Sequence, residues 1–203
     1  TQNHLFRFYF FYITKHRLMR KTLFTIILIA SMLASCEQKD QNFIIKDDQI
    51  GLLHKGAFIK QVDSIFAQDS IVSSSIKAIE GYQNEVEVFD KDGNQLMVLS
   101  PKQNNNPNSP ITHIQITDPR YKTDKGIGIK STYKDIKQHY AIQKVETTFS
   151  SIIVFLENSP IYISFDKEVL PDDIRYDLNL KVEPTQIPDD ATIKLFMVSW
   201  DID

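Results

Sequence analysis

The stretch from Met19 to Cys36 constrains this chain more than any other part of it. Arg20 and Lys21 precede a run of about a dozen apolar or small residues, and the run ends at Cys36. A positive start followed by a short apolar core and small residues is typical of a secretory signal. The run is too short to cross a bilayer, which needs about 20 apolar residues. We therefore predict that residues 19–35 are the signal peptide of an exported protein.

The last four residues of this stretch, Leu33, Ala34, Ser35 and Cys36, resemble the lipobox of bacterial lipoproteins. The resemblance implies that the Cys36 thiol receives a lipid, becomes the mature N-terminus and carries palmitate-type acyl chains into the membrane. Glu37 occupies the second mature position, where some enteric bacteria use Asp as a signal for inner-membrane retention. The resemblance therefore implies the cell outer membrane, and it leaves the periplasmic and external faces open.

The charge of the chain changes when the signal is removed. Five of the 23 Lys and Arg, and none of the 26 Asp and Glu, lie in residues 1–35. The mature chain of 168 residues then has 18 cations against 26 acids, a net charge of −8. Nucleic acid needs clustered cations, so we expect no nucleic-acid partner. Cationic or neutral partners remain open.

Two further features bound the mature protein. Cys36 is the only Cys, so an exported protein of this sequence has no disulfide and is stabilised by packing. The mature length is enough to bury a sizeable core.

Residues 1–18 begin without Met and carry an aromatic cluster that Arg7 interrupts. We interpret them as an upstream extension, with Met19 as the initiator.

The first half of the mature chain has helical spacing followed by strand-like alternation. We interpret residues 36–48 as a lipidated, flexible tether, and the apolar residues between Phe58 and Phe66 recur at the spacing of a short helix. Alternating residues predict strands at 76–80, 85–89 and 95–99. Asp90 to Asn94 lies between the last two and predicts a tight hairpin turn, in which Gly93 takes a positive φ.

The second half has the same order of elements. Ser131 or Thr132 is a suitable N-cap for a helix that ends near Tyr140, and Asp135 suits its first turn. The pattern predicts strands at 111–116, 151–157, 161–165, 178–182 and 193–200. The loop over 102–110 breaks the periodicity. We therefore predict an α+β fold of two tandem units, each a short helix followed by an antiparallel β-sheet, at 49–103 and 111–203 with a linker at 104–110.

This order of elements resembles the helix-plus-antiparallel-sheet modules of the β-lactamase-inhibitor-like group, which includes small lipoproteins of outer-membrane assembly. The shared features are a Gly, a Ser or Thr that opens a short helix, and an aromatic residue that closes it, over about 17 residues in each half. The resemblance implies an α+β fold and a binding role, and it transfers no functional residue.

The most specific candidate for a metal site is the turn that contains Asp90, Asp92 and Asn94. Acids at alternate positions before a Gly can offer oxygens to calcium. The twelfth position counted from Asp90 is Pro101, where an EF-hand loop needs Glu, so that kind of calcium loop is excluded. A hairpin turn explains the same residues, and we expect no bound metal or cofactor.

The other candidate motifs have simpler structural explanations. Gly126 and Gly128 lack the third Gly of a nucleotide-binding loop. His54, His113 and His139 have no ligand spacing, and no nucleophile motif is present. The acid pairs at 47–48, 172–173 and 189–190 are expected in loops, and Trp200 is expected in the core.

These observations predict a non-enzymatic, lipid-anchored module of the cell envelope that binds another envelope protein or component. The alternative is an envelope ligand or calcium sensor, which binds in a pocket between the two units or at the 90–94 turn. Cys36 is the lipid-attachment site in both cases.

Overall fold

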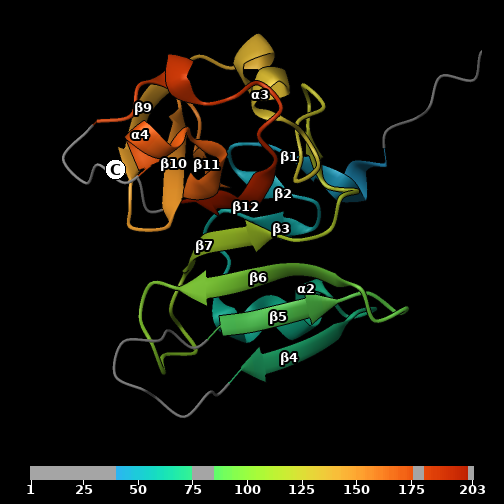
Figure 1. The fold of residues 1–203 in the computed structure, drawn as a ribbon. Helices are drawn as coiled ribbons and strands as arrows, with labels where there is room; N and C mark the ends of the chain where they lie inside the picture. Colours follow the sequence, from blue (N-terminus) through green and yellow to red (C-terminus); the bar gives the residue numbers. More distant parts are fainter. Residues whose placement is uncertain (1–39, 75–84, 176–180, 201–203) are drawn as a thin grey trace, which may run out of the picture. The chain divides into compact units, whose positions relative to one another are not determined.

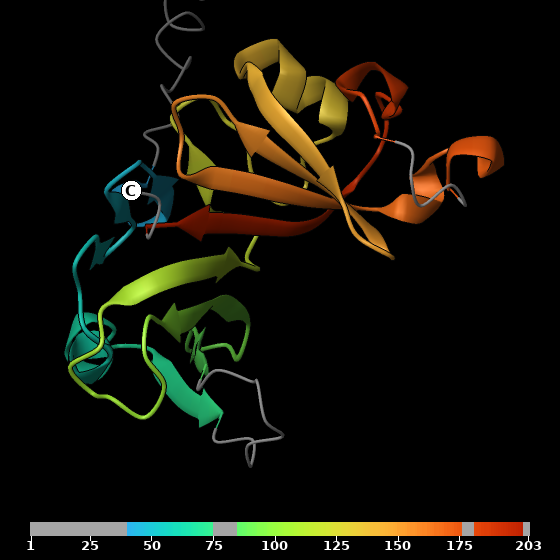
Figure 2. The same ribbon diagram turned by 90° about the vertical axis from the view of Figure 1, so that its left-hand side faces the viewer.

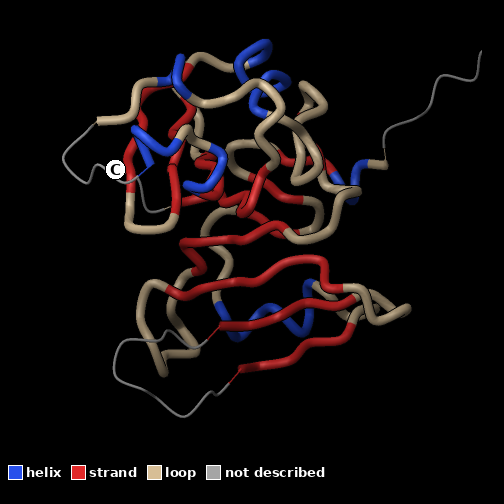
Figure 3. Tube along the Cα trace, viewed as in Figure 1, coloured by secondary structure: helices blue, strands red, loops and turns tan. Residues whose placement is uncertain are grey.

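The computed structural model describes residues 40–74, 85–175 and 181–200. The described residues all belong to one compact unit. The predictions for the signal peptide and Cys36 therefore lie outside the described residues, as does the strand predicted at 76–80. The α+β class is confirmed, although strands dominate and the helices are short (Figure 3). No helix in the described part of the chain is long and apolar enough to span a bilayer.

The main element is one antiparallel sheet of eight strands (Figure 1). The strands follow the order β4-β5-β6-β7-β12-β11-β10-β9 across the sheet. Their bounds are β4 Ser70–Ser74, β5 Glu85–Phe89, β6 Gln95–Pro101, β7 Ile111–Ile116, β9 Ile142–Thr147, β10 Ser151–Leu156, β11 Ile161–Asp166 and β12 Ile193–Ser199. The predicted strands at 85–89, 95–99, 111–116, 151–157, 161–165 and 193–200 are all present, whereas β4 and β9 were not predicted.

One face of this sheet forms the hydrophobic core. A row of register partners crosses all eight strands on this face, and its members are Val145, Val154, Ile163, Phe196, Ile116, Met97, Val88 and Ile71. All except Ile71 are buried, and Ile71 packs against the same core. The core is continuous through both halves of the sheet, because β7 pairs with β12 at its centre.

The helix predicted in the second half is confirmed as α3, Tyr133–His139. Thr132 is its N-cap: the Thr132 backbone N–H donates to the Asp135 carboxylate at 2.8 Å, and the Asp135 N–H donates back to the Thr132 hydroxyl at 3.3 Å. These bonds satisfy donors that a helix start leaves free. Tyr133 and Ile136 are fully buried on its inner side, where the Tyr133 ring packs edge-on against Phe165.

The helix predicted in the first half is shorter than its spacing suggested. Phe58 precedes a 3-10 turn, η2 (Ile59–Gln61), which continues into the single turn α2 (Val62–Ile65). Val62 and Phe66 are buried and pack on the sheet, so the apolar spacing correctly identified the inward side. Figure 2 shows α2 and α3 next to the two halves of the twisted sheet, and their buried residues place them on its core face.

A smaller sheet of very short strands corrects the prediction of a flexible tether over 36–48. Its order is β3-β2-β1-β8, with β1 Ile44–Ile45, β2 Gln49–Ile50, β3 Leu53–His54 and β8 Lys122–Thr123. A 3-10 turn, η1 (Gln41–Phe43), leads into β1, and Ile45 and Ile50 are buried. Residues 40–48 therefore belong to the fold. The prediction failed because two-residue strands carry too little alternation to be recognised.

The predicted division into two units with a linker at 104–110 is not what the structure contains. The loop after β6 returns directly to β7, and these two strands pair with each other. The strands of both halves belong to one continuous sheet, whose order is mirrored about the β7–β12 pair. The described residues therefore do not contain a separate antiparallel sheet for each half, because β7 pairs with β12 and joins the strands of both halves into one sheet.

The described part of the segment between β11 and β12 contains three single turns. These are η3 Lys167–Val169, α4 Asp172–Arg175 and η4 Pro184–Gln186. The strand predicted at 178–182 is not supported at its described end, since Lys181 and Val182 lie outside any strand. Val182 is nevertheless buried in the core.

Candidate binding surfaces

The three candidate calcium ligands lie together in the turn between β5 and β6. One Asp90 carboxylate oxygen accepts the backbone N–H groups of Asp92, at 3.0 Å, and of Asn94, at 2.9 Å. The Asn94 side-chain amide lies 3.2 Å from each Asp90 oxygen. Gly93 has φ +82°, the conformation expected from the sequence. Asp90 thus organises the turn by accepting bonds from its own neighbours.

The second Asp90 oxygen binds Arg120, which lies in the loop after β7. The Arg120 Nη2 is 2.5 Å from Asp90 Oδ2 and 2.6 Å from Asp118 Oδ2, and Arg120 Nε is 3.0 Å from both Asp118 oxygens. The Asn94 backbone N–H, with help from Arg120, lowers the pKa of Asp90 to about 2. The bonds to Asp118, with a smaller contribution from Asp90, raise the pKa of Arg120.

This arrangement does not fit calcium at the turn. Both oxygens of Asp90 already accept N–H donors, so a cation there would have to displace Arg120 and open the turn. Among the residues that the structure describes, no group of three or more His, Cys, Asp or Glu side chains could hold a metal ion. The hairpin explanation of Asp90, Asp92 and Asn94 therefore accounts for their geometry.

Arg120 also connects this turn to the start of the fold. Its guanidinium carbon lies 4.5 Å from the centroid of the Phe43 ring, a cation–π distance, and Phe43 packs edge-on against Tyr121 at 5.0 Å. Phe43 belongs to η1, Arg120 follows β7, and Asp90 follows β5. Three segments far apart in the sequence therefore meet around one guanidinium group.

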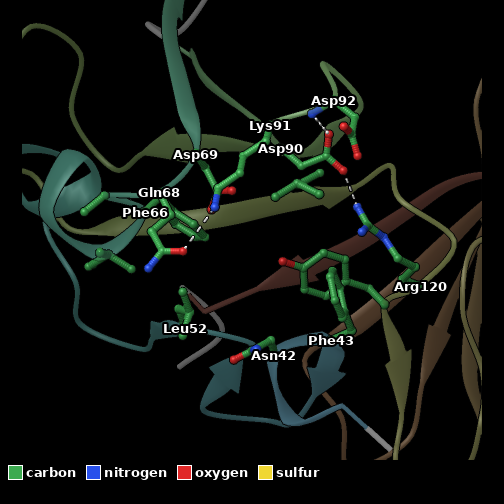
Figure 4. A pocket seen from close by; sticks show the side chains of 14 residues that line it. Asn42, Phe43, Leu52, Phe66, Gln68, Asp69, Asp90, Lys91, Asp92 and Arg120 are labelled. Atoms are coloured by element: carbon green, nitrogen blue, oxygen red, sulfur yellow. Dashed lines mark hydrogen bonds and ion pairs between the residues drawn. The ribbon is translucent and has the colours of Figure 1, made fainter.

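A pocket of about 550 Å³ opens beside this cluster (Figure 4). Its walls come from η1, the turn between β2 and β3, α2 and the residues after it, the β5–β6 turn, the start of β6 and the loop after β7. The lining residues are Asn42, Phe43, Leu52, Ile65, Phe66, Ala67, Gln68, Asp69, Asp90, Lys91, Asp92, Leu96, Arg120 and Tyr121. The pocket thus combines apolar walls with a few charged groups, the usual composition of a small-molecule site.

Asp69 and Asp92 are the carboxylates of the pocket that lack an ion-pair partner among the described residues. The Asp69 side chain is half-buried, whereas Asp92 is exposed. Burial, and then the negative charge of Asp90, raise the pKa of Asp69 above its ordinary value, against the weaker effects of Lys91 and Arg120. The folded protein therefore holds this negative charge at a cost.

A second candidate surface is the sheet face opposite the core, which we call the open face. One row of register partners crosses all eight strands on this face: Lys144, Phe155, Tyr162, Met197, Gln115, Val98, Glu87 and Val72. These residues alternate with the core row, so they project to the other side of the sheet. Phe155, Tyr162 and Met197 are half-buried, Val98 is buried, and Val72 is 50% exposed.

The aromatic part of the open face is ordered by its own contacts. The Phe155 and Tyr162 rings stack with centroids 5.6 Å apart and an angle of 23° between their planes. The Lys144 ammonium lies 4.3 Å from the Phe155 centroid. Leu195, 36% exposed, lies on β12 on the same side as Met197. The open face thus presents ordered aromatic and aliphatic side chains.

The remaining residues singled out from the sequence form no additional site. His54 and His139 are exposed and His113 is half-buried, as expected for histidines without ligand spacing. Trp200 is 6% exposed and its indole N–H donates to the Asp47 carbonyl, which confirms its place in the core. Cys36, the predicted lipid-attachment residue, lies outside the described residues.

Sequence reasoning missed Asp69, Asp118, Arg120 and the open face. Arg120 and Asp90 are 30 positions apart, and no local spacing links them. The open-face residues alternate with core residues, and this alternation correctly predicts strands. Without the strand order, however, the sequence does not show which of the two alternating sets lies on the core face and which on the open face.

Comparisons with known proteins add a fold relationship only. No protein-family model matches the chain. No curated protein is similar enough in sequence to count as a match. Among solved structures, the crystal structure of the uncharacterized protein YfeY from Escherichia coli aligns with a TM-score of 0.50 and 17% identity, over 75% of this chain and 97% of that one. At this identity the likeness concerns the fold.

Proposed function

We propose that this protein is a lipid-anchored cell-envelope module that binds another envelope protein through the open face of its eight-stranded sheet, without enzymatic activity. The observation that carries the proposal is the row of Phe155, Tyr162 and Met197 on the face opposite the core. Cys36 is the lipid-attachment residue, and the outer membrane is the proposed location.

The composition of the open face supports a protein partner. Tyr, Phe and Met are enriched at protein interfaces, where charged residues lie mainly at the rim. Phe155, Tyr162 and Met197 follow one another across three strands, with Lys144 next to Phe155 and the polar Gln115 next to Met197. Stacking holds the two rings in place, so binding costs little side-chain entropy there.

The start of the fold supports the anchoring part of the proposal. Asp40 caps η1, and β1 begins at Ile44. Only Glu37, Gln38 and Lys39 separate Cys36 from Asp40, and three residues span about 10 Å at most when extended. A lipid on Cys36 would therefore keep the described fold close to the membrane surface, where an envelope partner is also confined.

We also propose that the two halves of the sheet descend from one duplicated helix-plus-sheet unit. The mirrored strand order about the β7–β12 pair supports this origin. So do two isolated bridges: Phe58, before η2, bridges Pro110, before β7, and Thr132, before α3, bridges Thr192, before β12. A duplication that joined its halves through β7 and β12 would create the continuous open face.

The anchoring part is tested by membrane fractionation of cells that make the full chain or its Cys36→Ser variant. We expect the unchanged chain in the membrane fraction, resistant to high salt and released by detergent. We expect the Cys36→Ser chain to lose this association. A variant that stays in the membrane fraction to the same extent would contradict lipid anchoring through Cys36.

The binding part is tested by hydroxyl-radical footprinting of Met197. We expect oxidation of Met197 to be slower in native envelopes than in the purified mature chain, because a partner covers the open face. Tyr140, half-buried next to α3, is the internal control and should react equally in both samples. Equal oxidation of Met197 in the two samples would contradict the proposal.

A further inference from the structure

We infer that the pocket beside the Asp90 turn binds an organic cation, an amine or guanidine whose apolar body lies against Phe43 and Leu52 and whose charged end meets the Asp69 carboxylate. This site is separate from the open face, and the inference does not depend on the proposed protein partner.

The pocket has the size and walls that such a ligand needs. Its volume of about 550 Å³ lies within the range of roughly 300–1,000 Å³ that is usual for small-molecule sites. Figure 4 shows Asp69 and Asp90 on one side of the pocket, with Leu52, Asn42 and Phe43 on the other. Leu52 is 47% exposed, so burying it against a ligand would remove apolar surface from water.

The charges around the pocket favour a cation. The cationic side chains are Lys91 and Arg120, and the nearby carboxylates are Asp69, Asp90, Asp92 and Asp118, which leaves a net charge of −2. Arg120 forms one ion pair with Asp90 and one with Asp118, so its positive charge is already matched within the protein. An anionic ligand would have to compete with these two carboxylates.

Asp69 supplies the specific recognition group. Lys91 is a cationic side chain near Asp69, but its ammonium lies 3.4 Å from the Gln68 side-chain carbonyl. No ion pair joins Lys91 to Asp69 among the described residues. The half-buried Asp69 charge is unfavourable in the free protein, as its raised pKa indicates. An ammonium group donates a hydrogen bond to a carboxylate and also neutralises its charge. A hydroxyl of the same size donates the hydrogen bond but leaves the charge unmatched.

The test is calorimetric titration of the mature chain with n-hexylammonium, using n-hexanol and hexanoate as neutral and anionic analogues. We expect hexylammonium to bind at least about tenfold more tightly than either analogue, because a hydrogen bond between two charged groups is stronger than one that involves a neutral partner. Equal binding of hexanol, tighter binding of hexanoate, or no binding of hexylammonium would overturn the inference.

Two variants with the same change in charge locate the site. Asp69→Asn should weaken hexylammonium binding at least about tenfold, and Asp63→Asn, an exposed residue of α2 outside the pocket lining, should leave it unchanged. Asp69→Asn is expected to fold, because it removes a charge that the folded state disfavours at neutral pH. Equal weakening by both variants would overturn the inference.

A competition experiment distinguishes a free amine from the side chain of a protein. A short acetylated peptide with one central lysine is added to the chain saturated with hexylammonium. Displacement at millimolar peptide supports a lysine side chain as the natural ligand, and absence of displacement supports a free amine. Footprinting of Met197 reports separately on the open face, so failure of either proposal leaves the other intact.

Discussion

Gln115 on β7 and Met197 on β12 lie directly opposite each other in the antiparallel pair that joins the two halves of the eight-stranded sheet. Through this pair the row on the open face continues from Phe155 and Tyr162 to Val98 and Glu87. The same pairing continues the core on the other side, where Phe196 lies opposite Ile116. One strand pair therefore creates both the shared core and the proposed binding face.

The shared core predicts that the two halves unfold together. Phe196 is fully buried at the centre of the core row, and Phe196→Ala should lower the free energy of unfolding by about 3–5 kcal/mol. Leu195→Ala, the neighbouring change on the open face, should cost about 1 kcal/mol or less. Urea denaturation followed by circular dichroism measures both. Two separate transitions would contradict a single cooperative core.

The cap of α3 predicts a smaller and local effect. Thr132→Ala removes the hydroxyl that accepts the Asp135 N–H, and it should destabilise the protein by about 1 kcal/mol. Gln138→Ala, an exposed position in the same helix, is the control and should change stability by less than about 0.5 kcal/mol. The measurement is the midpoint of urea unfolding at constant m value. Equal midpoints for the two variants would show that the cap is energetically unimportant.

Asp90 predicts a defined dependence of stability on pH. Its pKa is lowered from 3.8 to about 2 in the folded protein, mainly by the Asn94 backbone N–H. The ionised group therefore stabilises the fold above about pH 4, and this contribution is lost as pH falls toward about 2. The Tm difference between the unchanged protein and Asp90→Asn should shrink over that interval.

Asp92→Asn is the matched control, because Asp92 lies in the same turn and carries the same charge. Its Tm should follow that of the unchanged protein more closely than Asp90→Asn does at neutral pH. A Tm difference for Asp90→Asn that stays constant down to about pH 2 would show that the Asp90 carboxylate does not gain stability from its bonds in the folded state.

The elements that could be predicted from sequence are those whose local pattern and tertiary role agree. Six strands follow from alternation, and the turn at Gly93 and the cap at Thr132 follow from residue chemistry that acts within a few positions. β9 was missed because Val145 is its only buried residue, so its sequence shows little alternation of apolar and polar residues. The two-residue strands β1, β2, β3 and β8 were missed because two residues carry too little alternation to be recognised, and β8 also depends on pairing with the distant β1.

The candidate sites depend on long-range pairing and could not be predicted. The pocket needs Phe43, Asp69 and Arg120 to meet, and the turn at Asp90 was predicted without its Arg120 partner. The open face needs the strand order across β7 and β12. The turn residues Asp90, Asp92 and Asn94 were correctly placed in a hairpin, and the metal alternative arose because turn chemistry and calcium chemistry use the same oxygens.

The most direct test of the central proposal is site-specific photo-crosslinking from position 197 in cells that make the full chain. A photoreactive residue in place of Met197 should give one discrete protein adduct in the membrane fraction. The same residue in place of Lys134, exposed on α3 over the opposite face, should give none. Failure of position 197 to crosslink in membrane-associated protein, or the same adduct from both positions, would contradict binding through the open face.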